Sequence, residues 1–234
     1  MSVDKLLWDV FTEYNLRGNP LEPTRMSLGN FRTFCKDCRI FERISKAEIE
    51  VMFSQELSKQ EKKGKTLLYS RFLELLARVA KKLFQKLQNE IEVALQEFIA
   101  SYILPNAKKR RSLLANLEDA LKDNEVGKLR VEFEPSIRDL MRKYDTMIRN
   151  QAAVQISYSE FLRFAHNYDL IQSGLITTYQ LGEIYFFVLQ IIPTDDDVIP
   201  SLDFQKFWSA LYLCSIESFS YSSADMPQHY LMSL

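Results

Sequence analysis

Glycine, proline and histidine are scarce in this sequence, and each scarcity excludes a class of protein. The 234 residues include 6 Gly and 7 Pro, too few for a collagen-like chain or for a sandwich with many tight turns. The 2 histidines, His166 and His229, argue against most histidine-dependent catalytic schemes. The 3 cysteines cannot all pair with one another, which favours a reducing, cytosolic compartment.

Long hydrophobic runs and a net charge are missing as well. The best apolar run covers residues 184–192, whereas a helix needs about 20 apolar residues to cross a bilayer. The first residues contain no apolar core of a signal peptide. With 30 basic and 31 acidic side chains, the chain has no general reason to bind nucleic acid or an anionic membrane. We therefore expect neither as a partner.

Apolar residues recur at helical spacing along most of the chain. Two capping boxes, Ser45 with Glu48 and Thr177 with Gln180, mark helix starts. Residues 124–135 form a polar connector in this interpretation, with a short extended stretch at 129–133. The longest helical pattern, over residues 69–104, allows a break near residues 88–89. The expected helices cover residues 3–14, 30–38, 45–57, 69–104, 112–121, 137–148, 159–168, 179–192 and 204–216.

Four short strings repeat one pattern of large apolar residues. In each, an apolar residue is followed two positions later by another, and then three positions later by Phe. The end of an EF-hand loop has this pattern, with the first residue on a short strand that pairs two loops and the Phe anchoring the exit helix. The first and third strings lie 130 residues apart, and the second and fourth 135 apart. The strings are residues 26–31, 67–72, 156–161 and 202–207.

The repeat predicts an all-α fold of two tandem degenerate EF-hand-like modules joined by a long helical connector. The first module covers residues 1–85, the connector with a basic run 86–132, and the second module 133–216. The tail, 217–234, has no helical stripe and is either a disordered end or an arm that orders on a partner. The alternative is a coincidence of patterns in an all-helical chain.

The loops lack the residues of a calcium site. Such a loop needs oxygen ligands at positions 1, 3 and 5 and a bidentate Glu at position 12, and placing each Phe at position 13 fixes the register. In loop one, positions 1, 3, 5 and 12 are then residues 19, 21, 23 and 30, and in loop two they are residues 60, 62, 64 and 71. In loop three they are residues 149, 151, 153 and 160, and in loop four residues 195, 197, 199 and 206. Arg71 and Lys206 place positive charge at position 12. We expect no metal ion and no cofactor.

One acidic turn is the remaining place for a weakly held ion. It surrounds loop four, and the alternative is a solvated turn. Without an ion the fold depends on its apolar core, because each buried large side chain contributes about 2–3 kcal/mol. The acidic residues are Asp195, Asp196, Asp197 and Asp203. The expected core residues are Phe31, Phe34, Phe53, Phe72, Phe161, Phe164, Phe207 and Trp208.

Three stretches of the first half resemble the tubulin polymerization-promoting protein family. Residues 34–40 read FCKDCRI, residues 50–54 read EVMFS and residues 67–76 read LLYSRFLELL. The resemblance covers about residues 1–80 and depends most on the Cys-Lys-Asp-Cys stretch. It implies an association with tubulin and microtubules.

The pair Cys35 and Cys38 could supply half of a zinc site. A closed zinc site needs four ligands, and Cys214 and His166 are the available additions. The alternative is a pair of structural thiols.

Two basic stretches are candidate contacts for the acidic surface of tubulin. One lies in loop two and the other follows Pro105, and the alternative in both cases is a solvated basic turn. The candidate residues are Lys62, Lys63, Lys65, Lys108, Lys109, Arg110 and Arg111.

The sequence contains no glycine-rich phosphate loop, no nucleophile elbow and no His–Glu metal motif, so we expect no enzyme. The first function that fits is a structural, microtubule-associated protein of a cilium or flagellum. It would brace tubulin and other axonemal proteins, with the inside of a doublet microtubule as one location. The alternative is a calcium-independent adaptor that binds a partner helix in an EF-hand-like groove.

Overall fold

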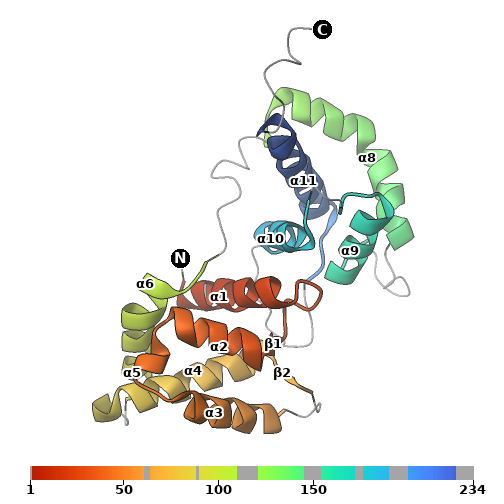
Figure 1. Cartoon of the computed structure of the whole chain (residues 1–234). Helices are drawn as coiled ribbons and strands as arrows, with labels where there is room; N and C mark the ends of the chain where they lie inside the picture. The colour runs from red at the N-terminus through yellow and green to blue at the C-terminus, as the bar shows by residue number, and fades with distance from the viewer. Residues whose placement is uncertain are drawn as a thin grey trace. The chain divides into compact units, whose positions relative to one another are not determined.

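The computed structural model describes residues 2–60, 64–87, 90–109, 121–144, 154–171, 176–189 and 200–224, with side chains to residue 218. The chain divides into two compact units, Met1–Arg110 with Thr194–Asp197, and Arg111–Pro193 with Val198–Leu234 (Figure 1). Within the described residues, extended structure is limited to two short strands and one isolated bridge. The predicted all-α class is therefore confirmed.

The first unit contains two helix–loop–helix hands. Its two short strands run antiparallel, with Met26 opposite Leu67, so the two loops pair at the predicted residues (Figure 1). Three serines start helices by accepting a backbone N–H, which satisfies groups that a helix start leaves free. The elements are α1 (Val3–Gly18), β1 (Met26–Ser27), α2 (Leu28–Asp37), α3 (Lys46–Ser58), β2 (Thr66–Leu67) and α4 (Tyr69–Leu83).

A further helical segment packs on α4 and belongs to the first unit. It consists of η2 (Gln85–Leu87), α5 (Ile91–Phe98), a π-helical turn (Ile99–Ile103) and α6 (Leu104–Asn106). α4 ends at Leu83, and Phe84 then packs its ring 6.2 Å from that of Tyr102, which brings the chain back onto α4. The helix predicted over 69–104 is interrupted between Leu83 and Ile91, in the region where the sequence allowed a break near residues 88–89. Residues 91–106 of the predicted connector are helical.

The second unit repeats the hand arrangement. Its described helices are α8 (Asn124–Tyr144), α9 (Tyr158–Asn167), α10 (Thr178–Leu189) and α11 (Phe204–Ala224). Ile156 and Leu202 form an antiparallel bridge with N···O distances of 2.9 and 2.8 Å. This is the pairing that the third and fourth strings predict. The helix expected at 112–121 falls on residues that are almost all outside the described ranges.

A triangle of phenylalanine rings lies beneath the paired loops of the first unit. Phe31, Phe34 and Phe72 are fully buried. The ring of Phe72 meets Phe31 at 6.3 Å and Phe34 at 5.8 Å, in both cases nearly edge-on. Tyr14 of α1 meets Phe34 edge-on at 5.5 Å. The exit-helix anchors therefore form one aromatic core, as predicted.

The second unit has the same triangle at equivalent positions. Phe207 meets Phe161 at 6.1 Å and Phe164 at 5.3 Å, again nearly edge-on. Among the described residues, each unit has one non-glycine residue with positive φ, Arg39 at 56° and Asp169 at 53°, and the two lie 130 residues apart. A left-handed backbone is uncommon for such residues, so its recurrence at one spacing supports a duplicated unit.

α8 continues through Pro135, so the predicted polar connector over 124–135 is wrong. A proline inside a helix removes one backbone hydrogen bond and costs about 3 kcal/mol. Arg130 and Arg138 lie on either side of the proline, and their guanidinium carbons are 5.6 and 4.1 Å from the ring centre of Phe204. These two cation–π contacts hold both halves of α8 against α11.

α11 also extends beyond the predicted end at residue 216, as far as Ala224. Gln180 of α10 donates from Nε2 to Oε2 of Glu217 at 3.1 Å, which ties this additional turn to the unit. The predicted tail at 217–234 is thus helical at its start, and residues 225–234 lie outside the described ranges.

A buried carboxylate joins α3 to α4. The side chain of Glu56 is fully buried, and its Oε1 lies 2.7 Å from Lys59 Nζ and 2.8 Å from Arg78 Nη1. Burial raises the pKa of Glu56, but the hydrogen bonds and charges of Lys59 and Arg78 outweigh burial and hold the pKa below its ordinary value. The ion pair therefore stabilises the packing of the two helices.

The substitution Glu56→Gln should lower the free energy of unfolding at pH 7 by about 2 kcal/mol, since bonds to charged groups contribute about that much. Folding lowers the pKa of this carboxyl. Its contribution is therefore complete above the unfolded pKa, near 4, and is lost as pH falls through the folded pKa. The difference between variant and wild type should shrink between about pH 5 and pH 3, which urea unfolding at each pH measures.

The control is Glu50→Gln. Glu50 lies 2.6 Å from Arg32, but both side chains are exposed, so the loss should stay below about 1 kcal/mol. Equal losses for the two variants would contradict the role assigned to the buried pair.

Candidate functional site

The two parts of the chain carry opposite charge, although the whole chain is almost neutral. Residues 1–110 contain 20 Lys and Arg against 14 Asp and Glu, and residues 111–234 contain 10 against 17. An excess of one sign attracts partners of the opposite sign and accelerates their association. The first part is therefore suited to an acidic partner.

The predicted basic contacts lie on different elements of the first unit. Lys65 is exposed in loop two, directly before β2. Lys108 and Lys109 are exposed beyond α6, where the backbone N–H of Lys108 donates to Tyr14 Oη at 3.2 Å. Nζ of Lys108 lies 3.3 Å from Asp37 Oδ2, and Lys109 donates to the carbonyl of Leu104 at 3.0 Å. Lys62, Lys63, Arg110 and Arg111 lie outside the described residues.

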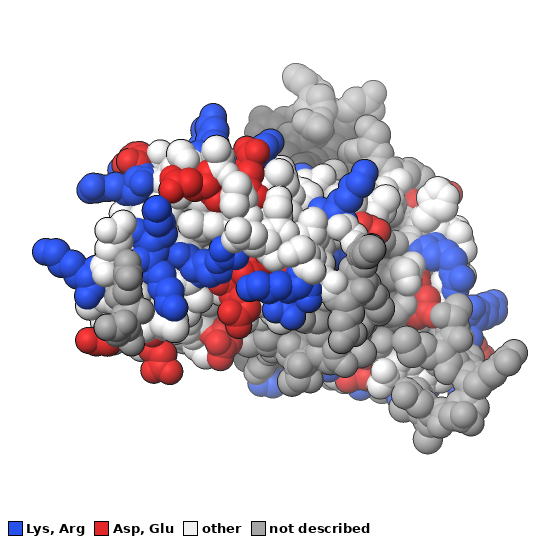
Figure 2. Space-filling model, turned by 90° about the horizontal axis from the view of Figure 1, so that it is seen from below, with Lys and Arg blue, Asp and Glu red and all other residues white. Residues whose placement is uncertain are grey.

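Three further cations at the end of α4 are absent from the sequence-based prediction. The name α4 basic end is used here for Lys81 and Lys82 of α4 together with Lys86 of η2. Lys82 Nζ lies 3.0 Å from Glu48 Oε1 of α3, whereas Lys81 and Lys86 have no ion pair among the described residues. The available signal was a pair of lysines in the last helical turn, where cations are stabilised by the helix dipole. Figure 2 shows how Lys and Arg side chains alternate with Asp and Glu side chains on one face.

Loop two is closed by a glutamine side chain. Gln60, at position 1, donates from Nε2 to the carbonyl of Thr66 at 3.1 Å and accepts from the N–H of Leu68 at 2.8 Å. A calcium loop needs a carboxylate at position 1 and a bidentate Glu at position 12, where loop two has Arg71. The residues of this loop do not fit a calcium ion.

Loop one is closed by two asparagines. Asn15 of α1 is fully buried and donates from Nδ2 to the carbonyl of Pro23 at 3.1 Å. Asn30, at position 12, donates from Nδ2 to Asn15 Oδ1 at 3.3 Å. Asn30 thus bonds to the entering helix, and neither it nor Pro23 supplies a carboxylate. This loop does not fit calcium either.

The described parts of the other two loops use their charged residues in helix caps. Glu160, at position 12 of loop three, accepts from the N–H of Ser157 at 2.7 Å in a capping box. Asp203 accepts from the N–H of Lys206 at 2.9 Å and also forms an ion pair with it. Asp195, Asp196 and Asp197 lie outside the described residues. No cluster of three or more metal-ligating side chains occurs in the described ranges.

The three cysteines are buried. Cys35 and Cys38 are fully buried, and Cys214 is 3% exposed. Burial, and then the neighbouring Cys38, raises the pKa of Cys35, while burial and then Asp37 raise the pKa of Cys38 to about 12. These environments favour the neutral thiol, which is the form that the alternative of structural thiols expects.

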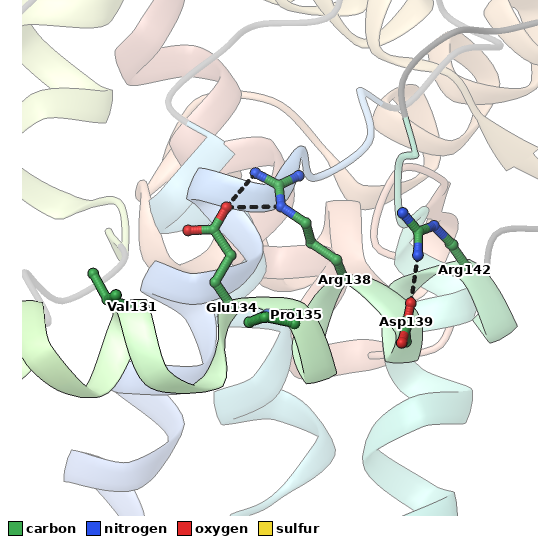
Figure 3. A pocket seen from close by; sticks show the side chains of 6 residues that line it. All are labelled: Val131, Glu134, Pro135, Arg138, Asp139 and Arg142. Atoms are coloured by element: carbon green, nitrogen blue, oxygen red, sulfur yellow. Dashed lines mark hydrogen bonds and ion pairs between the residues drawn. The ribbon is translucent and has the colours of Figure 1, made fainter.

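A shallow hollow on α8 offers no arrangement for catalysis. Its charged side chains are paired along the same helix, with Glu134 bonded to Arg138 at 2.8 Å and Asp139 bonded to Arg142 (Figure 3). It brings together no nucleophile and base. The described residues that line it are Val131, Glu134, Pro135, Arg138, Asp139 and Arg142. Within the described ranges, no helix is long and apolar enough to cross a bilayer.

Comparison with known families finds a similarity between most of the first unit and an EF-hand module. The family model described as tubulin polyglutamylase TTLL11, EF-hand, matches residues 15–109. The matched range begins in the last turn of α1 and ends at the last described residue of the first unit, so it covers α2 to α4 and the segment of α5 and α6. No curated protein sequence matches the chain. The first unit is therefore similar to the EF-hand module of a tubulin-modifying enzyme.

Native protein at pH 8 should resist a thiol reagent such as dithionitrobenzoate at all three cysteines. Burial, and then Glu217, raises the pKa of Cys214 to about 12 as well, and such a pKa leaves about one thiolate in ten thousand at pH 8. All three thiols should react within seconds to minutes in guanidinium. Absorbance of the released thiol measures both rates. If the cysteines of the native protein reacted rapidly and added zinc slowed that reaction, the result would instead support the zinc alternative.

Proposed function

We propose that this chain is a non-enzymatic, microtubule-associated structural protein whose basic first unit binds the acidic surface of tubulin. In this proposal it braces tubulin and neighbouring proteins of an axoneme in a cilium or flagellum. The observation that carries the proposal is one coincidence: the range that matches an EF-hand of a tubulin polyglutamylase is also the basic part of the chain.

Charge supports an acidic partner for the first unit. Lys81, Lys86, Lys65 and Lys109 are cations without an ion pair among the described residues, and they project from several elements. Lys65, Lys86 and Lys109 are exposed and Lys81 is half-buried. Surface charges of this kind steer association and make it sensitive to salt. The similarity of residues 34–40 to the tubulin polymerization-promoting protein family supports the same class of partner.

The described polar and reactive groups have roles within the fold. The buried thiols, the paired charges on α8 and the loop amides all have partners or environments that account for them. The proposal therefore assigns binding, and no reaction, to this chain.

The alternative adaptor would need an open groove for a partner helix. In the first unit, the segment of α5 and α6 packs on α4 and buries Ala94, Phe98 and Ile103 completely. The chain thus covers apolar surface of its own hand pair with its own helix, which favours the microtubule proposal over the adaptor.

Co-sedimentation of the full chain with microtubules tests the proposal. Lys81→Glu with Lys86→Glu should raise the dissociation constant about tenfold, equivalent to about 1.4 kcal/mol. Reversing all four charges of the run at Lys108, Lys109, Arg110 and Arg111 should weaken pelleting as well. Higher salt should weaken the wild type in the same direction.

The control is Arg142→Glu with Lys143→Glu, which reverses the same number of charges, both on α8. It should leave pelleting nearly unchanged. A wild-type chain that stays in the supernatant at low salt would contradict the proposal. If both pairs of substitutions weakened pelleting equally, binding would depend on the net charge of the chain rather than on a particular surface of the first unit.

A further inference from the structure

Gln60 lies where the chemistry of a calcium loop is concentrated. It occupies position 1, and the carbonyl that it contacts belongs to Thr66 at position 7, whose backbone oxygen is a ligand in a calcium-binding hand. The distance from Nε2 to that oxygen is 3.1 Å. An amide N–H therefore points at the oxygen that a calcium ion would bind.

The second hydrogen bond of Gln60 holds the backbone beside the paired strands. Its Oε1 accepts from the N–H of Leu68 at 2.8 Å. Thr66 and Leu68 flank Leu67, which is the residue of β2 that faces Met26 of β1. One side chain thus fixes the backbone on both sides of the residue that joins the two hands.

Loop one uses a similar device with other residues. Asn15 holds the carbonyl of Pro23, at position 5, and accepts from Asn30, at position 12. Gly18 makes room for this arrangement, because a Cβ there would lie 1.9 Å from Asn30 Oδ1. The side chain that would complete a calcium site is thus committed to the entering helix.

We infer that the amides of Gln60 and Asn15 take the structural place of calcium, so that the first unit is held in one loop-closed form at every calcium concentration. A calcium ion draws carbonyl and carboxylate oxygens together, and an N–H donor does the same for a carbonyl without an ion to desolvate. The inference does not depend on what the first unit binds.

A melting experiment on the full chain tests the role of Gln60. In a Trp208→Phe background, fluorescence of Trp8, which is 4% exposed in α1, reports on the first unit alone. Gln60→Met keeps a long side chain but removes both bonds, and it should lower the melting temperature by about 4–8 °C. Gln85→Met is the control, because Gln85 is exposed and should change little. Equal effects of the two substitutions would overturn the inference.

A second variant separates hydrogen bonding from packing. Gln60→Glu places an ionised acceptor against the Thr66 carbonyl at pH 7 and should destabilise the unit. Once protonated, the introduced carboxyl can donate to that carbonyl again, so folding raises its pKa and its deficit relative to wild type should narrow by pH 4.5. Lys59, Glu56 and Arg78 form the buried ion pair between α3 and α4 in both proteins. Comparison of variant and wild type at each pH removes the part of their titration that the substitution leaves unchanged. A deficit independent of pH would contradict the inference.

Calcium provides the last measurement. Wild type should melt at the same temperature, within about 1 °C, in millimolar calcium and in EDTA, because a ligand that does not bind cannot shift stability. A rise of several degrees in calcium would overturn the inference, whatever the outcome of microtubule pelleting.

Discussion

The antiparallel contact between two loops is the interaction on which each unit of this chain depends. Met26 faces Leu67 in the first unit, and Ile156 faces Leu202 in the second. Each contact lies above a phenylalanine triangle that joins the exit helices, so loop pairing and core packing reinforce one another. A two-residue strand is far too short to be stable alone, and burial of the aromatic core provides the stability that keeps the two loops paired.

In the first unit this contact has permanent supports. A bound ion would make loop closure depend on its concentration, whereas the bonds of Gln60 and Asn15 form with the fold itself. A protein responds to an effector only when the effector binds its states with different free energies. In this hand the groups that close the loops are side chains of the protein itself, so calcium has no open and closed forms to bind with different free energies. Such a hand is better suited to bracing a partner than to sensing calcium.

Local patterns of fixed spacing predicted much of the fold, and contacts between distant residues decided the rest. The four strings and both capping boxes could be read directly, since each depends on residues a few positions apart. The course of α8 through Pro135 depends on Phe204, which lies 66 residues beyond Arg138. The sequence placed Gln60 at position 1 of its loop, but its role follows only from the positions of Thr66 and Leu68.

Fixed loops and a basic surface have a joint consequence for binding. A surface that needs no ordering loses less conformational entropy on association, so weak charge–charge contacts are enough to hold it. The exposed lysines of the first unit extend from helices and loops whose backbone is already hydrogen-bonded, as at Lys82 beside Glu48. Such a surface would present the same pattern of charge in every calcium state, and salt, which screens exposed charges, would be the variable that changes its affinity.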